Sequence, residues 1–281
     1  SLQSSRFVKV IRARNERGAV VVKLFVKQDN TVSYTKYIRR IRDINSRLKG
    51  VHNAQGFERV IDTDRLVAVV RQYHFSSLYD RISTRPFLSY VEKQWISFQL
   101  LAGLADAHAL GVCHGDIKTE NVLVTSWCWA LLADFASFKP TFLPQDNPAA
   151  FAFFFDTSGR RTCCVAPERF YNPQTDKQTI AAVLVSETDE FREGDLTPAM
   201  DIFSLGCVIA ELFTESHALF SFAQLLAYRK GEYDITDTLN RIRDPEVRNL
   251  VAHMVQLDPT KRSSARACLK LWRGKAFPEQ F

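Results

Sequence analysis

Residues 114–124 read HGDIKTENVLV, and this stretch decides the fold. It contains Asp116 and Asn121, and a second strand-like run, WALLA, ends directly before Asp134. Carboxylate and amide oxygens are ligands that magnesium accepts, and a positioned carboxylate can take the proton of an attacking hydroxyl. The pattern predicts a phosphoryl-transfer site, with Asp116 as proton acceptor and Asn121 and Asp134 as metal ligands.

Further signals occur in the order that this chemistry requires. Lys23 stands upstream in the strand-like run VVVK, and a lysine in that setting holds the α- and β-phosphates of a nucleotide. Downstream follow APE, which ends at Glu168, DIFSLG, which begins at Asp201, and then Arg262. Each signal alone is weak, because carboxylates after strands are common. The ordered set is specific.

The first 75 residues are expected to form a small β-rich lobe. FVKVIRA and AVVVKLFV flank the turn RNERG, and FERVIDTDRLVAVVRQY contains the turn DTD, so two antiparallel hairpins are predicted. Between them, apolar residues recur at three- and four-residue spacing, which predicts one amphipathic helix over residues 33–49.

The rest of the chain, residues 76–281, is expected to form a larger, mainly helical lobe. SYVEKQWISFQLLAGLADAHALG, MDIFSLGCVIAELFTE and PEVRNLVAHMVQ all carry helical periodicity. The fold class is therefore α+β, with the two lobes joined through RQYHFSS into one domain. The polar stretch 172–199 is interpreted as an exposed insertion.

Composition excludes several classes of protein. The 281 residues are 46% hydrophobic and 24% charged, without a run of about 18 apolar residues that would cross a bilayer. The sequence shows neither a signal peptide nor an initiator Met, so we expect a trimmed part of a cytosolic protein. A net charge of +6 is modest, and no nucleic-acid partner is expected. The six cysteines show no CxxC spacing and are expected to be reduced and mostly buried.

The chain resembles a protein kinase domain over nearly its full length. More narrowly, it is similar to the kinase-like domain of the vacuolar-protein-sorting regulatory subunit of class III phosphatidylinositol 3-kinase complexes. The stretches that carry this likeness are LYDRISTRPFL, HGDIKTENVLVTSWCWALLADFASFKPTFLP, FFDTSGRRTCCVAPERF, AMDIFSLGCVIAELFTE, QLLAYRKG and GKAFPEQF.

This resemblance implies a two-lobed protein-kinase fold with an activation segment over residues 134–168, and a site for magnesium with GTP/GDP or ATP/ADP. The implied partners are the lipid kinase catalytic subunit of that complex and its accessory subunits. The full-length protein is implied to reach membranes through an N-terminal myristoylated segment, absent from this sequence, and to continue into helical repeats and a β-propeller. We therefore expect a cytoplasmic protein at the cytosolic face of endosomal and autophagic membranes.

Several residues receive roles through the resemblance. Glu168 and Arg262 resemble the ion pair that ties the end of the activation segment to a late helix. Asp201 resembles the helix aspartate that braces the catalytic loop, and Lys118 resembles the catalytic-loop lysine of the serine/threonine subgroup.

The segment of Arg71, Gln72 and Tyr73 is predicted to bind the nucleotide base. Alignment with the family places Arg71 behind the adenine amino group. Arginine only donates hydrogen bonds, whereas guanine offers an acceptor oxygen at that edge. We therefore hypothesise that GTP or GDP is tolerated or preferred; the alternative is that the side chain points elsewhere.

Departures from the kinase pattern affect both sides of the cleft. At the three positions where the family has the glycines of its phosphate-binding loop, this chain has Gln3, Ser5 and Val8. Their Cβ atoms prevent the backbone from approaching phosphates closely. The predicted helix offers Lys23 only Asp43 as a carboxylate partner, which puts the usual ion pair in doubt.

The catalytic loop and activation segment also depart from the pattern. Gly115 replaces the arginine that pairs with a phosphorylated activation segment, so phosphorylation is not expected to switch this chain. Ala136 replaces a glycine beside Asp134 and disfavours flipping there, but not metal binding. Four phenylalanines can order the segment by packing instead: Phe151, Phe153, Phe154 and Phe155. They either pack on the large lobe or form a patch for a partner.

Two functions stay open at this stage. The favoured one is a regulatory pseudokinase that binds nucleotide and magnesium and holds the lipid kinase in one state during endosomal sorting and autophagy. The alternative is a weakly active serine/threonine protein kinase that uses ATP or GTP. A scaffold without nucleotide is a third, disfavoured by the retention of Lys23, Asn121 and Asp134.

Overall fold

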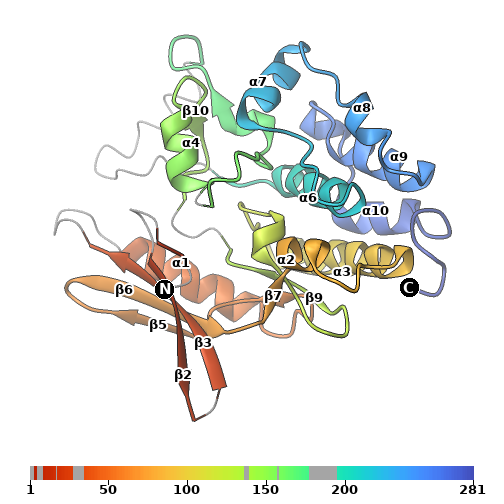
Figure 1. Cartoon of the computed structure of the whole chain (residues 1–281). Helices are drawn as coiled ribbons and strands as arrows, with labels where there is room; N and C mark the ends of the chain where they lie inside the picture. The colour runs from red at the N-terminus through yellow and green to blue at the C-terminus, as the bar shows by residue number, and fades with distance from the viewer. Residues whose placement is uncertain are drawn as a thin grey trace.

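The computed structural model describes residues 3–4, 9–16, 18–27, 35–135, 139–156, 158–176 and 195–281, and it shows the two lobes that the sequence predicts (Figure 1). The smaller lobe carries a five-stranded antiparallel sheet in the order β1-β2-β3-β6-β5. Its strands are β1 (Gln3–Ser4), β2 (Lys9–Asn15), β3 (Gly18–Val26), β5 (Arg59–Asp62) and β6 (Leu66–Gln72). The β2–β3 and β5–β6 pairs confirm both predicted hairpins.

Helix α1 (Thr35–Arg47) confirms the predicted helix and covers one face of this sheet. Val69 of β6 packs in the same apolar cluster as the helix, and Lys23 of β3 is its direct neighbour in the sheet register. Side chains opposite each other on antiparallel strands share a face. Lys23 therefore belongs to the face that α1 covers. The buried residues of the helix and the turn after it are Tyr37, Ile38, Ile41, Ile44 and Leu48.

A second sheet connects the lobes. It has the order β4-β9-β8-β7, with β4 (Ala54–Gln55), β7 (Ser76–Ser77), β8 (Val122–Val124) and β9 (Ala130–Ala133). Strand β4 comes from the N-terminal part of the chain and pairs in parallel with β9. The predicted connection over residues 71–77 runs from β6 into β7. Helix α2 (Leu78–Ser83) follows at once, because Ser77 and Asp80 form a capping box.

Helices fill the larger lobe, as predicted. They are α3 (Tyr90–Ala109), α4 (Pro148–Phe154), α6 (Pro198–Phe213), α7 (Phe222–Lys230), α8 (Thr236–Leu239), α9 (Pro245–Met254) and α10 (Ala265–Leu271). Short 3₁₀ turns lie at η1 (Thr119–Asn121), η2 (Pro167–Arg169) and η3 (Pro259–Lys261), and β10 (Leu143–Pro144) pairs in parallel with β11 (Phe170–Tyr171).

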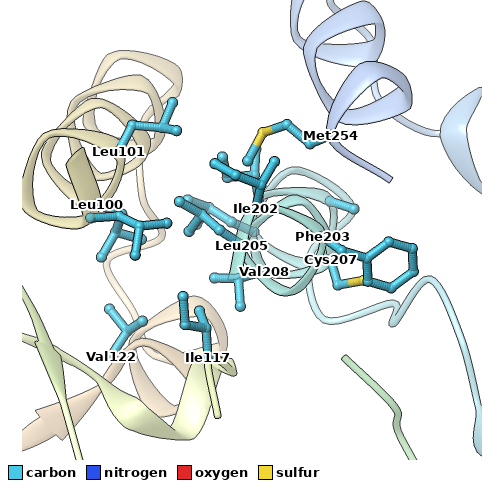
Figure 2. Close-up of a cluster of buried hydrophobic side chains, with 14 of the residues drawn as sticks. Leu100, Leu101, Ile117, Val122, Ile202, Phe203, Leu205, Cys207, Val208 and Met254 are labelled. Carbon is cyan, nitrogen blue, oxygen red and sulfur yellow. The ribbon is translucent and has the colours of Figure 1, made fainter. Parts of the chain in front are cut away.

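Helix α6 lies at the centre of this lobe. Figure 2 shows its apolar side chains between Leu100 and Leu101 of α3 and Met254 of α9. A Cβ atom at Gly206 would lie 2.8 Å from Val255 Cγ1 and 2.9 Å from Met254 Cβ. Only glycine therefore allows α6 and α9 to approach this closely, and α6 becomes the rigid support of the catalytic loop.

The start of helix α6 sets where the insertion predicted over residues 172–199 can end. The helix begins at Pro198 and therefore includes the last two residues of the predicted insertion. Residues 177–194 lie outside the described residues. Within the described ranges, no helix is long and apolar enough to cross a membrane.

Candidate active site

Lys23 of β3 and Asp134, which follows β9, meet between the two lobes. Lys23 Nζ lies 3.0 Å from Asp134 Oδ2, and both side chains are largely buried. Asp134 follows β9 with a φ of +64°, a left-handed conformation that is uncommon for a residue with a Cβ atom and that concentrates at functional sites. Burial alone would raise the pKa of Asp134, but Lys23 and Arg71 outweigh it and hold that pKa below its ordinary value.

Arg71 is the second cation on Asp134. Its Nε donates to Oδ1 at 3.0 Å and its Nη2 to Oδ2 at 3.2 Å, while Nη1 donates to the carbonyl of Gln72 at 3.2 Å. The register places Lys23 opposite Val69 and Arg71 two residues further along β6, so both cations leave the same face of the sheet. The structure therefore has the guanidinium on the carboxylate rather than at a base edge.

The other two residues predicted to contact the base lie at the start of the connection between lobes. Gln72 is exposed, and Tyr73 is half-buried with the guanidinium of Arg12 over its ring at 4.2 Å. The Tyr73 amide donates to the carbonyl of Ala19 at 3.1 Å, which holds this segment against β3.

Asp116 and Asn121 lie together in the catalytic loop. Asn121 Nδ2 donates to Asp116 Oδ2 at 2.7 Å and to its carbonyl at 2.8 Å. Lys139 of the activation segment donates to the same Asp116 oxygen at 2.6 Å. Burial raises the pKa of Asp116, but Lys118 and Lys139 outweigh it, so the pKa lies below its ordinary value.

Lys139 was not singled out in the sequence, although FASFKP places a cation shortly after Asp134. Burial lowers the pKa of Lys139 to about 8, and repulsion from Lys118 and Lys23 adds to this, although Asp116 opposes both. The contact with Asp116 therefore opposes the cost of burying this lysine.

Asp201 holds the catalytic loop from α6. Its Oδ2 accepts the His114 amide at 2.7 Å and His108 Nε2 at 3.0 Å, and its Oδ1 accepts the Gly115 amide at 2.8 Å. Gly115 has a φ of +77°, which a residue with a Cβ atom rarely adopts. These are the contacts that a bracing role requires.

Arg262, whose side chain is buried, and the half-buried Glu168 form a bidentate pair. Nη1 lies 2.7 Å from Oε1 and Nη2 lies 3.0 Å from Oε2. The same guanidinium donates to the carbonyls of Gln256, Leu257 and Ala199. The pair therefore joins η2 to η3 and to the start of α6.

Arg169 is a structural residue that sequence reasoning missed. It is 1% exposed, and it donates to the carbonyls of Gly115 and Thr141, each at 2.7 Å, and of Pro140 at 3.0 Å. Burial lowers its pKa to about 10 although nearby carboxylates oppose this. Arg169 thus ties the activation segment to the loop at Gly115, the position where the family pattern has an arginine. Its place directly after APE was the only available signal.

The substrate side of the catalytic loop is covered by the activation segment. Lys118 Nζ donates to the carbonyl of Phe155 at 2.8 Å, and the rings of Phe151 and Phe155 are buried on the large lobe. Phe153 is 37% exposed, while Phe154 is half-buried and also touches the α1 cluster. The pocket beside Asp116 and Lys118 offers about 20 Å³, room for about one water molecule.

The predicted departures have the following outcomes. Gln3 lies in β1, whereas Ser5, Val8 and Ala136 lie outside the described residues. Asp43 is exposed and pairs with Arg47 on the same helix at 2.9 Å. In the described part of the chain, the ion pair of Lys23 is therefore made with Asp134 and not with α1.

Comparisons with known proteins agree with this geometry. The family model "Protein kinase domain" matches residues 4–179. The chain belongs to the protein kinase domain family. Over its full length it is 47% identical to "Serine/threonine-protein kinase VPS15" of Arabidopsis thaliana, 46% identical to "Probable serine/threonine-protein kinase vps15" of Dictyostelium discoideum and 43% identical to "Serine/threonine-protein kinase VPS15" of Saccharomyces cerevisiae. These matches confirm the narrower resemblance drawn from the sequence.

The matched chain is only a small part of each relative. The chain covers 18%, 14% and 19% of the lengths of these three relatives. Activities, substrates and partners of the whole protein are therefore proposals. The family in general binds a nucleotide with magnesium.

Proposed function

We propose that this chain is a nucleotide-binding regulatory pseudokinase module that scaffolds and regulates a class III phosphatidylinositol 3-kinase in endosomal sorting and autophagy. One observation carries the regulatory part. Each group that phosphoryl transfer would use is engaged by another group of the same chain: Asp116 by Lys139, Lys118 by the Phe155 carbonyl, and Asp134 by Arg71.

Slow transfer follows from the state of Asp116. An efficient general base has a pKa near the working pH and a lone pair that faces the substrate hydroxyl. The pKa of Asp116 is lowered instead, and Lys139 and Asn121 both donate to its Oδ2. The pocket beside Lys118 has room for about one water molecule.

Nucleotide binding is supported by the residues at the base of the cleft. Lys23 is placed to contact phosphates, and Asn121 and Asp134 are oxygen donors of the kind that hold magnesium in this family, although in this structure Arg71 already contacts both oxygens of Asp134. We include GTP and GDP with ATP and ADP among the ligands. A contact from Arg71 to guanine would require it to leave Asp134 or the Gln72 carbonyl.

The lipid kinase complex and a site at endosomal and autophagic membranes belong to the same proposal. Their support is the similarity to VPS15 kinases over the whole length of this chain, together with the long sequence stretches noted above. The test is co-purification of the catalytic and accessory subunits with the full-length protein. Assembly that is unchanged when this domain is deleted would contradict a scaffolding role.

The nucleotide itself is tested by denaturing freshly purified protein and identifying the released small molecule by chromatography and mass. Recovered GDP or GTP would support guanine nucleotides as ligands. Recovered ADP or ATP would support a nucleotide-binding module but not the guanine ligands. Added nucleotide should also raise the unfolding temperature, because a ligand of the native state stabilises it by mass action. Lys23→Ala should reduce that shift, because Lys23 is placed to contact phosphates, and an unchanged shift in this variant would place the ligand elsewhere.

A weakly active serine/threonine kinase is the second candidate. It is favoured by the presence of Lys23, Asp116, Asn121 and Asp134 between the lobes, and by the similarity to proteins named serine/threonine-protein kinases. Stoichiometric autophosphorylation that Asp116→Asn abolishes would establish it. Its absence, with nucleotide bound, leaves the pseudokinase proposal.

A further inference from the structure

Asp134, the carboxylate that would hold magnesium in a kinase of this family, already carries two cations of the chain. Arg71 contacts both of its oxygens, at 3.0 and 3.2 Å, and Lys23 contacts Oδ2 at 3.0 Å. A guanidinium that spans both oxygens is the strongest geometry available to an arginine–carboxylate pair. All three side chains are largely enclosed, with Arg71 and Asp134 exposed by only 8% and 7%.

The local charges support the same view. Two lysines, Lys118 and Lys139, act on Asp116, and Lys23 and Arg71 contact Asp134, so cations outnumber these two carboxylates. A site with one lysine and the same two carboxylates would lack this surplus and would depend on divalent cations. A nucleotide polyphosphate that enters this cleft meets fixed positive charge from the protein itself.

Magnesium and the guanidinium compete for the same oxygens. Magnesium requires near-octahedral oxygen ligands at about 2.0–2.1 Å. An ion at that distance from either Asp134 oxygen would lie beside the guanidinium and repel it in a poorly solvated site. Arg71 must therefore leave before Asp134 can serve as a metal ligand.

We infer that Arg71 takes the place of magnesium at Asp134, so that this chain binds a nucleoside diphosphate without a divalent cation. The inference rests on the proposed nucleotide-binding function and defines its cofactor requirement. Arg71 is then a specificity-determining residue, because it sets which cation neutralises the phosphates. Removal of its charge should create a conventional dependence on magnesium.

The experiment is calorimetric titration of GDP, and separately of ADP, into the purified chain in excess EDTA and in excess magnesium. For the wild-type chain, the two dissociation constants for a given nucleotide should agree within about threefold. In Arg71→Met, magnesium should lower the dissociation constant by about tenfold or more. Arg59→Met is the matched control, since Arg59 is an exposed arginine on the edge strand β5, and it should behave as wild type.

The outcomes separate this inference from the proposed function. Wild-type binding that is lost in EDTA overturns the role of Arg71 and leaves the nucleotide-binding module intact. Absence of binding in both buffers overturns both. A second measurement uses only the wild-type chain and so does not depend on folding of the variant. Mn²⁺ is titrated into the chain without nucleotide, and electron paramagnetic resonance should show that the Mn²⁺ remains free. Stoichiometric Mn²⁺ binding contradicts the inference.

Discussion

The site has a frame, formed by Asp201, Glu168 and Arg262, and reacting groups, which include Asp116 and Asp134. The two sets are held in different ways. The frame makes the contacts that the family resemblance implies, with Asp201 on the loop amides and Arg262 on Glu168. The reacting groups are held by partners outside that pattern, such as Lys139 on Asp116 and Arg71 on Asp134. A kinase fold can therefore keep its architecture while its own side chains occupy the positions of metal and substrate.

The frame should show the largest effect on stability. Arg262→Leu leaves Glu168 without its partner and releases three backbone carbonyls, so the free energy of unfolding should fall by about 3–5 kcal/mol. Denaturant titration measures this loss. Arg266→Leu is the control, because Arg266 is 71% exposed and its contact with Asp106 should contribute less than about 1 kcal/mol. Equal losses in both variants would remove the distinction between frame and surface.

The cover over the substrate side should show the next largest effect. Phe151 is 4% exposed and stacks on Phe222 with ring centroids 4.8 Å apart, so Phe151→Ala should lower the free energy of unfolding by about 3 kcal/mol. Phe153→Ala, on the same helix, should cost well under half as much, since this ring is 37% exposed. Denaturant titration of both variants decides. Comparable losses would show that α4 is not held by burial of Phe151.

The charged groups should produce a smaller effect, visible as acid sensitivity. Burial would raise the pKa of Asp116 and of Asp134, yet nearby lysines and Arg71 hold both below their ordinary values in the folded state. The unfolded chain then binds more protons near its ordinary carboxyl pKa of about 4, so stability rises with pH there and is lost as pH falls below that value.

Each such carboxyl can contribute at most about 1.4 kcal/mol per pH unit to this slope. Urea titrations at several pH values between about 5 and 3 measure it. Arg71→Met should make the acid loss shallower, because it removes one cation that lowers the pKa of Asp134. An unchanged slope in this variant would mean that Arg71 does not stabilise the carboxylate.

The sequence predicted the frame well, because frame residues combine local periodicity with a fixed order of motifs. Both hairpins were predicted from apolar runs on either side of turn sequences, and α1 and the helices of the large lobe from apolar periodicity. The partners of the reacting groups were harder to find. Lys139 reaches Asp116 across 23 residues, and the structural residue Arg169, which belongs to the frame, reaches Gly115 across 54 residues; no local pattern encodes such contacts. Arg71 was identified, but the direction of a long, flexible side chain depends on its tertiary surroundings.

The smallest expected effect concerns Asp43, the carboxylate on α1 that the sequence offered to Lys23. It is exposed and pairs with Arg47 at 2.9 Å one turn along the helix. An exposed pair of this kind contributes about 0.3–0.5 kcal/mol. Asp43→Ala should therefore lower the free energy of unfolding by no more than about 0.5 kcal/mol, and the dissociation constant for GDP should stay within about twofold of wild type.

This variant sharpens the comparison because it separates α1 from the cleft. In an arrangement where a helix carboxylate orients Lys23, its removal weakens phosphate binding. Here Lys23 is oriented by Asp134, 3.0 Å away, so the helix carboxylate is dispensable. A tenfold loss of GDP affinity in Asp43→Ala, measured by calorimetry, would show that α1 moves toward Lys23 when nucleotide binds, and the reacting groups would then depend on α1 as well as on Arg71 and Asp134.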